Sequence, residues 1–190
     1  MRTLASLAAL AAVLAIAACA RPDPRCASLP GGGRYCLQPT GAIAPFEAQQ
    51  KVEASFGDGR RETMIVELET DANGMRFAAL TPFGHKILEM AYDNGAASAA
   101  AGPDSRLDPA LAMAMLQLAL WPADAVRAGL GEGLLLEESG RQRRILSGGE
   151  VLMSVNWVGD AVPYRRLVIA LPAARLTLEV ETLPDAESPR

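Results

Sequence analysis

Three cysteines, Cys19, Cys26 and Cys36, are the residues of this sequence best suited to covalent chemistry. The first ends the tetrapeptide Ile-Ala-Ala-Cys at 16–19, which fits a bacterial lipobox, where the thiol is diacylated and the chain is cut before the cysteine. Arg2 supplies the positive charge typical of a signal peptide, and the apolar run that follows is short for a membrane span. We therefore predict a signal peptide over 1–18 and lipidation of Cys19.

An alternative is ordinary secretion, because Ala18-Cys19-Ala20 also fits an A-x-A cleavage site. Both alternatives take the chain out of the cytoplasm. The residue after Cys19 is alanine rather than aspartate, which is the pattern of lipoproteins sorted onward in Gram-negative bacteria. The predicted location is the periplasmic face of the outer membrane, with the lipid as anchor.

Cys26 and Cys36 remain as an even pair once Cys19 is acylated. In an oxidising compartment such a pair forms a disulfide, and the Pro- and Gly-rich segment between them can fold back. A metal site would need further ligands, and His85 is the only histidine. A redox role is disfavoured because the spacing is not C-x-x-C. We predict a Cys26–Cys36 disulfide.

Catalysis has little support in the sequence. His85 lies in an expected hairpin beside Lys86, and no serine lies in a G-x-S-x-G motif. The glycine-rich run 129–133 lacks the lysine and the strand-to-helix context of a phosphate loop. We therefore expect that the protein is not an enzyme, that it has no catalytic residue and that it binds no metal or cofactor.

The charge of the chain limits its partners. A net charge of −4 makes nucleic acid an unsuitable ligand. Arg141, Arg143 and Arg144 form a small basic patch, which is interpreted as a solvated hairpin, with an anionic lipid headgroup site as the alternative.

Strands account for most of the predicted structure. Between residues 46 and 56 apolar and polar side chains alternate, as in a sheet with one buried face. Alternation and turn residues predict further strands over 64–69, 75–81, 86–92, 134–138, 143–146, 151–158, 164–171 and 175–182, and a hairpin turn at 93–95 that starts another. Because short turns join neighbours, we expect a meandering antiparallel sheet.

Two helices interrupt these strands. Asp108 is a suitable N-cap before Pro109, and strong helix formers fill 110–121; a second short helix is predicted over 122–128. Only Gln117 is polar in the first helix, so this helix is either buried on every side or borders an apolar cavity.

The methionines favour the cavity, because thioether side chains adapt to varied apolar shapes. The predicted ligand-binding residues are Leu111, Met113, Met115, Leu118 and Trp121 of the helix, with Phe77, Tyr92 and Trp157 of the strands. The three strand residues also suit core positions.

The segments TPFGHKIL at 81–88, YDNG at 92–95 and LQLALWP at 116–122 resemble a family of bacterial lipoproteins of unknown function. Its members are often encoded beside aryl polyene biosynthesis genes, and its architecture is similar to that of the lipoprotein carriers LolA and LolB. The resemblance spans roughly residues 35–182. It implies a mainly β (α+β) fold, an incomplete antiparallel β-barrel of about ten strands, with two short helices as a lid or plug over a hollow for acyl chains. The sequence does not locate the protruding hydrophobic loop through which LolB hands its cargo to the membrane.

Four segments are therefore expected: a signal peptide at 1–18, an acylated N-terminus and tether at 19–33, the LolB-like barrel domain at 34–183 and a tail at 184–190. The resemblance implies a membrane-anchored, monomeric carrier of a lipid, a lipoprotein acyl chain or a polyene lipid. The alternative is a non-catalytic structural lipoprotein that supports an envelope assembly through protein contacts. A hollow that is open, rather than filled by side chains, would favour the carrier.

Overall fold

The computed structural model describes residues 23–100 and 108–184. The predicted signal peptide, Cys19 and all of the predicted tail after Pro184 lie outside these ranges. Within them, no helix is both long enough and apolar enough to cross a membrane.

Ten strands form one antiparallel sheet, in the order β7-β6-β5-β4-β3-β12-β11-β10-β9-β8. Their bounds are Phe46–Phe56 (β3), Arg61–Thr70 (β4), Met75–Leu80 (β5), Lys86–Tyr92 (β6), Ala97–Ala99 (β7), Leu134–Ser139 (β8), Gln142–Ser147 (β9), Glu150–Val158 (β10), Arg166–Leu171 (β11) and Leu176–Thr182 (β12). The prediction of a mainly β fold with an open antiparallel sheet of ten strands and two helices is confirmed.

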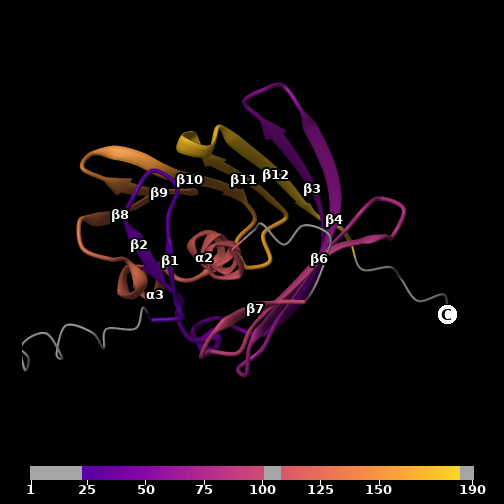
Figure 1. The fold of residues 1–190 in the computed structure, drawn as a ribbon, viewed down its shortest axis with the longest axis horizontal. Coiled ribbons are helices and arrows are strands. Elements are labelled where there is room, and N and C mark those ends of the chain that lie inside the picture. The colour runs from indigo at the N-terminus through magenta and orange to yellow at the C-terminus, as the bar shows by residue number, and fades with distance from the viewer. Residues whose placement is uncertain (1–22, 101–107, 185–190) are drawn as a thin grey trace, which may run out of the picture.

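The sheet consists of two five-stranded meanders joined in the middle rather than one continuous meander. The joining pair is β3 with β12, which run antiparallel from Phe56 opposite Leu176 to Gln50 opposite Thr182. β7 and β8 are the two edges, and they do not pair with each other. The sheet therefore curves without closing, and it surrounds helix α2 (Figure 1).

Helix α2 (Pro109–Leu120) begins as the sequence predicts, because Asp108 accepts a hydrogen bond from the backbone N–H of Ala110 at 2.9 Å and Pro109 takes the first helical position. The helix packs against β6 and β7 at one edge of the sheet. A second helix, α3 (Ala123–Gly129), follows and leads into β8.

A small sheet of β1 (Cys26–Ser28) and β2 (Arg34–Cys36) lies against α2 on the side that the large sheet leaves open (Figure 1). The backbone N–H of Gly131 donates to the carbonyl of Arg34 at 2.8 Å, which links this pair to the segment before β8. Within the described residues, regular structure begins at Cys26, upstream of residue 34, from which the sequence predicts the domain. Two short 3-10 helices, Thr40–Ala42 and Pro172–Ala174, complete the described elements.

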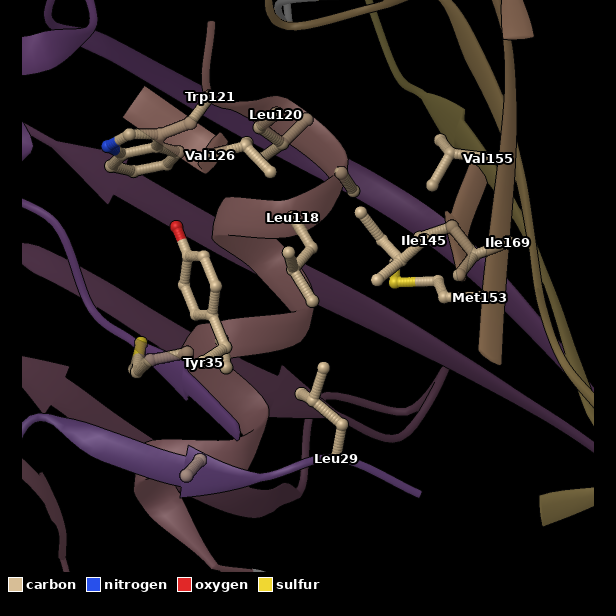
Figure 2. Packing of buried hydrophobic residues seen from close by; sticks show 14 of the residues in the cluster. Leu29, Tyr35, Leu118, Leu120, Trp121, Val126, Ile145, Met153, Val155 and Ile169 are labelled. Carbon is tan, nitrogen blue, oxygen red and sulfur yellow. The ribbon is translucent and has the colours of Figure 1, made fainter. Parts of the chain in front are cut away.

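The core lies between α2 and the sheet. Leu118 of α2 points toward Ile145 of β9 and Met153 of β10 (Figure 2), and all three side chains are at most 1% exposed. Tyr35 of β2, whose hydroxyl donates to Gln117 of α2, is also fully buried. These contacts fix α2 within the curve of the sheet.

Candidate ligand-binding site

The face of the sheet that carries the core is apolar along nearly its whole width. We call it the inner face; strand register places on it Ala48, Val52 and Ala54 of β3, Met64, Val66 and Leu68 of β4, Phe77 and Ala79 of β5, Leu88 and Met90 of β6, Ile145 of β9, Met153, Val155 and Trp157 of β10, Leu167 and Ile169 of β11, and Leu176, Leu178 and Val180 of β12. Several of these side chains, including Phe77, Leu88 and Leu178, are only partly buried.

Helix α2 has two faces that differ in burial, and its one polar side chain, Gln117, lies on the buried face. The buried face carries Met113, Ala114, Gln117 and Leu118. The opposite face carries Leu111, Ala112, Met115 and Leu116, all partly exposed and all apolar. We call this second set the open face of α2. A partly exposed face without a single polar side chain is the feature of this helix that a core position does not explain.

The eight predicted ligand-binding residues are separated by the structure into two sets. Met113, Leu118, Trp121 and Tyr92 are at most 1% exposed. Leu111, Met115, Phe77 and Trp157 are only partly buried. The second set can contact a ligand without displacing the core, so it contains the better candidates.

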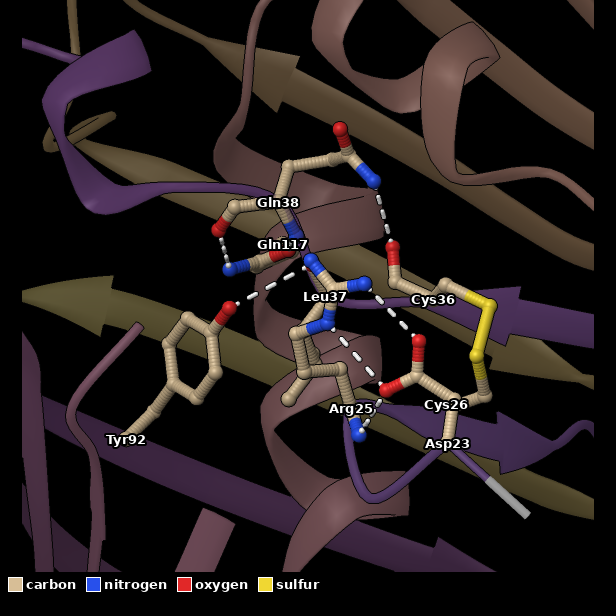
Figure 3. Close-up of a disulfide and its surroundings, with 8 residues drawn as sticks. All are labelled: Asp23, Arg25, Cys26, Cys36, Leu37, Gln38, Tyr92 and Gln117. Carbon is tan, nitrogen blue, oxygen red and sulfur yellow. Dashed lines mark hydrogen bonds and ion pairs between the residues drawn. A yellow bond between two sulfur atoms is a disulfide. The ribbon is translucent and has the colours of Figure 1, made fainter. Parts of the chain in front are cut away.

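Two of the buried residues donate hydrogen bonds to the segment 37–39, which follows β2. The indole Nε1 of Trp121 donates to the carbonyl of Pro39 at 3.3 Å, and the hydroxyl of Tyr92 donates to the carbonyl of Leu37 at 3.3 Å. The disulfide predicted from the cysteine count joins Cys26 to Cys36 and lies beside this segment (Figure 3). Gln117 contributes as well, since its Oε1 accepts from the backbone N–H of Gln38 at 2.7 Å.

Arg143 is not part of a solvated basic patch, which corrects the sequence interpretation. Its side chain is 4% exposed, donates to the carbonyls of Leu118 and Trp121 at 2.9 and 2.8 Å, and pairs with Glu138 at 2.6 Å. The helix C-terminus and a carboxylate replace the water that an arginine otherwise needs. Arg141 and Arg144 do remain exposed on the same hairpin.

Two other polar groups belong to the inner face. Gln50 of β3 donates through Nε2 to the hydroxyl of Thr182 at 3.1 Å, and that hydroxyl donates to the carbonyl of Tyr164 at 2.7 Å. The ring of Tyr164 stacks on Trp157 with 5.3 Å between centroids.

Two hollows described by the structure lie away from α2. One of about 460 Å³ is lined by outward-facing residues of β3 to β6, among them Glu47, Glu67 and Glu89. Another of about 220 Å³ lies at the turns beside Asp71 and Asp93. Neither includes a residue of α2, so they do not form an apolar binding site.

The turn between β5 and β6 holds an exposed aromatic residue that the sequence interpretation did not identify as functional. Phe83 is 90% exposed, although the turn is well hydrogen-bonded: Thr81 N–H donates to the His85 carbonyl at 2.8 Å and Gly84 N–H to the Thr81 carbonyl at 2.9 Å. A Pro-Phe-Gly sequence inside a predicted hairpin turn was the available signal, because turn side chains point into solvent.

Shifted pKa values occur at three tyrosines and in an exposed ion pair among the described residues. Burial raises the pKa of the Tyr35, Tyr92 and Tyr164 hydroxyls above the ordinary value. The guanidinium of Arg25 lowers the pKa of exposed Asp23 to about 2. Among the described residues, no group of three or more His, Cys, Asp or Glu side chains is arranged to hold a metal ion.

Comparison with known proteins gives a family but no function. Residues 47–184 match the family model described as "Protein of unknown function (DUF3261)". A search of curated proteins finds no match. Among solved structures, the fold is similar to a LolA superfamily protein from Nitrosomonas europaea, with a TM-score of 0.47, 7% identity and coverage of 78% of this chain and 93% of that chain. It is also similar to a putative outer membrane lipoprotein-sorting protein domain from Vibrio parahaemolyticus, with a TM-score of 0.36, 6% identity and coverage of 76% and 86%.

Proposed function

We propose a carrier function for this chain, which belongs to the DUF3261 family of proteins of unknown function. In this proposal the chain binds a lipid, a lipoprotein acyl chain or a polyene-type lipid between α2 and the inner face of the sheet. It then passes that ligand on at the outer membrane, to which the acylated Cys19 anchors it.

The observation that carries the proposal is the open face of α2. Leu111, Met115 and Leu116 are partly exposed, yet the helix lies within the curve of an apolar sheet face. A helix that served only as core would be covered on these positions or would carry polar side chains there. An acyl chain would remove this apolar surface from water, which is favourable by about 25 cal/mol per Å².

The anchor would keep the domain close to its membrane. β1 begins at Cys26, so the segment from Cys19 can span at most about 25 Å even when fully extended. A ligand leaving the domain would therefore have a lipid surface nearby.

Phe83 supports the transfer step of the proposal. It projects from the turn between β5 and β6, and these two strands also supply Phe77 and Leu88 to the inner face. An exposed aromatic side chain of this kind can enter the interfacial region of a bilayer.

A structural role in an envelope assembly is the second candidate, and one observation favours it. The protein itself covers the side chains of four predicted ligand-binding residues, Met113, Leu118, Trp121 and Tyr92. If the remaining apolar surface were also covered, the domain would be a scaffold rather than a carrier.

The proposal is tested by extracting lipids from the Cys19→Ser chain purified without detergent and analysing them by mass spectrometry. The carrier account predicts long-chain lipids in amounts comparable to the protein, and fewer in a Met115→Glu variant. A parent protein free of lipid would contradict it.

A further inference from the structure

Gln50 is an amide placed among apolar side chains. It lies on the inner face between Ala48 and Val52, opposite Val66 of β4, and the residue is 4% exposed. Burying an amide in such surroundings is unfavourable unless its hydrogen-bonding groups find partners.

The amide is held in one orientation by its neighbour on β12. Nε2 of Gln50 donates to Thr182 Oγ1 at 3.1 Å, and Thr182 in turn donates to the carbonyl of Tyr164. This arrangement uses one of the two N–H groups of the Gln50 amide. One N–H and the carbonyl oxygen Oε1 are left, and no described residue donates a hydrogen bond to Oε1.

These remaining groups lie on the inner face of the sheet. Among the described residues, the only enclosed side-chain polar atom without a hydrogen-bond partner is Thr70 Oγ1. Oε1 of Gln50 is not such a fully enclosed atom: no described residue donates to it, and the residue keeps 4% of its surface exposed. The Gln50 amide therefore offers a donor and an acceptor side by side within an apolar surface.

Among the described residues, no charged side chain of the inner face is available to complement an ionised ligand. Arg143 and Glu138 pair with each other, and Arg143 also donates to two carbonyls of α2. A carboxylate or phosphate at Gln50 would be desolvated without a counter-charge, which is strongly unfavourable.

We propose that Gln50, oriented by Thr182, binds the uncharged polar group of the carried lipid. This inference rests on the proposed carrier function and specifies its ligand class, a long apolar chain ending in or joined to an amide, hydroxyl or ester. A secondary or primary amide fits best, because its N–H can donate to Oε1 while its carbonyl accepts from Nε2.

The test is displacement of the neutral fluorescent probe N-phenyl-1-naphthylamine by dodecanamide, dodecanol and dodecanoate, near pH 8, where the carboxylate is ionised. The parent chain is compared with Gln50→Met, which keeps the length of the side chain and removes its hydrogen bonds. Gln49→Met, the same substitution on the exposed outer face of β3, is the matched control.

We expect the parent to bind dodecanamide most tightly and dodecanoate least. Gln50→Met should weaken binding of dodecanamide, relative to binding of the probe by the same variant, by between about twofold and tenfold, the usual effect of one or two hydrogen bonds. Gln49→Met should behave as the parent does.

Two results would overturn the inference while leaving the carrier function intact: equal dodecanamide affinity in Gln50→Met and Gln49→Met, or tighter binding of dodecanoate than of dodecanamide by the parent. A parent that does not bind the probe at all would instead overturn the carrier function, and this inference with it.

Discussion

Arg143 donates to the carbonyl of Trp121 over 2.8 Å and thereby ties strand β9 to the end of helix α2. The same guanidinium satisfies the carbonyl of Leu118, so two of the helix's unpaired C-terminal carbonyls depend on one side chain. The position of α2 within the sheet, on which the candidate site depends, is therefore set by a buried charge as well as by apolar packing.

Replacing Arg143 with methionine should be strongly destabilising, by about 3 kcal/mol, because it leaves Glu138 without its partner and both carbonyls without a donor. Arg144→Met, on the same strand but exposed and paired with Glu137, should cost less than about 1 kcal/mol. Urea unfolding of both variants measures the difference. Similar midpoints for the two would contradict the role assigned to Arg143.

The Cys26–Cys36 disulfide should stabilise the fold, since it closes a ring with a sequence separation of 10. In a Cys19→Ser background, replacing both cysteines with serine should lower the free energy of unfolding by about 3 kcal/mol, the value for a short loop. Thiol titration of the unfolded, unreduced parent checks the bond itself. The titration should find no free thiol, and finding two would show that the bond is absent.

Tyr35 should make stability decrease at alkaline pH. Burial raises the pKa of the Tyr35 hydroxyl in the folded state. The contribution of this hydroxyl to the free energy of unfolding is therefore complete below the pKa of the unfolded chain, about 10, and is lost as the pH rises above that value. The hydroxyl donates to Gln117 Oε1 at 3.2 Å. Tyr35→Phe should therefore cost about 1 kcal/mol at neutral pH and flatten the alkaline decline of the urea midpoint. An unchanged decline would show that Tyr35 does not contribute.

Phe83→Ser should slow transfer of a bound fluorescent probe to vesicles of phosphatidylethanolamine and phosphatidylglycerol. Thermal stability and probe affinity should stay unchanged, because the side chain is 90% exposed. Leu135→Ser, which removes another exposed apolar side chain, 65% exposed on the edge strand β8, is the control and should transfer normally. Equal transfer rates for the two variants would remove Phe83 from the proposal.

Local patterns in the sequence predicted the elements well. Alternation in 46–56 gave β3, Asp108 and Pro109 marked the start of α2, and an even cysteine count gave the disulfide. Each of these depends on residues close together in the chain or on the compartment.

Relationships between distant segments were not predictable in this way. The pairing of β3 with β12 joins the first and last strands of the large sheet, and no local turn signals it. The burial of Arg143 depends on the end of α2, which lies more than a strand away in the sequence. The burial of Met113 but not Met115 depends on how α2 is rotated about its own axis in the fold. A helix apolar on all sides contains no sequence signal for that orientation.

The central claim, that the open face of α2 borders a ligand rather than core, is tested most directly by two glutamate substitutions two residues apart. Met115 is partly exposed and Met113 is fully buried. Met115→Glu should fold, because the charge can reach water when no ligand is bound, but should lose binding of N-phenyl-1-naphthylamine. Met113→Glu should unfold the domain, since a buried, unpaired charge costs several kcal/mol. The measurement is a thermal melt and a probe titration of each variant. A folded Met115→Glu variant that binds the probe as tightly as the parent, or one that unfolds as Met113→Glu does, would contradict the account.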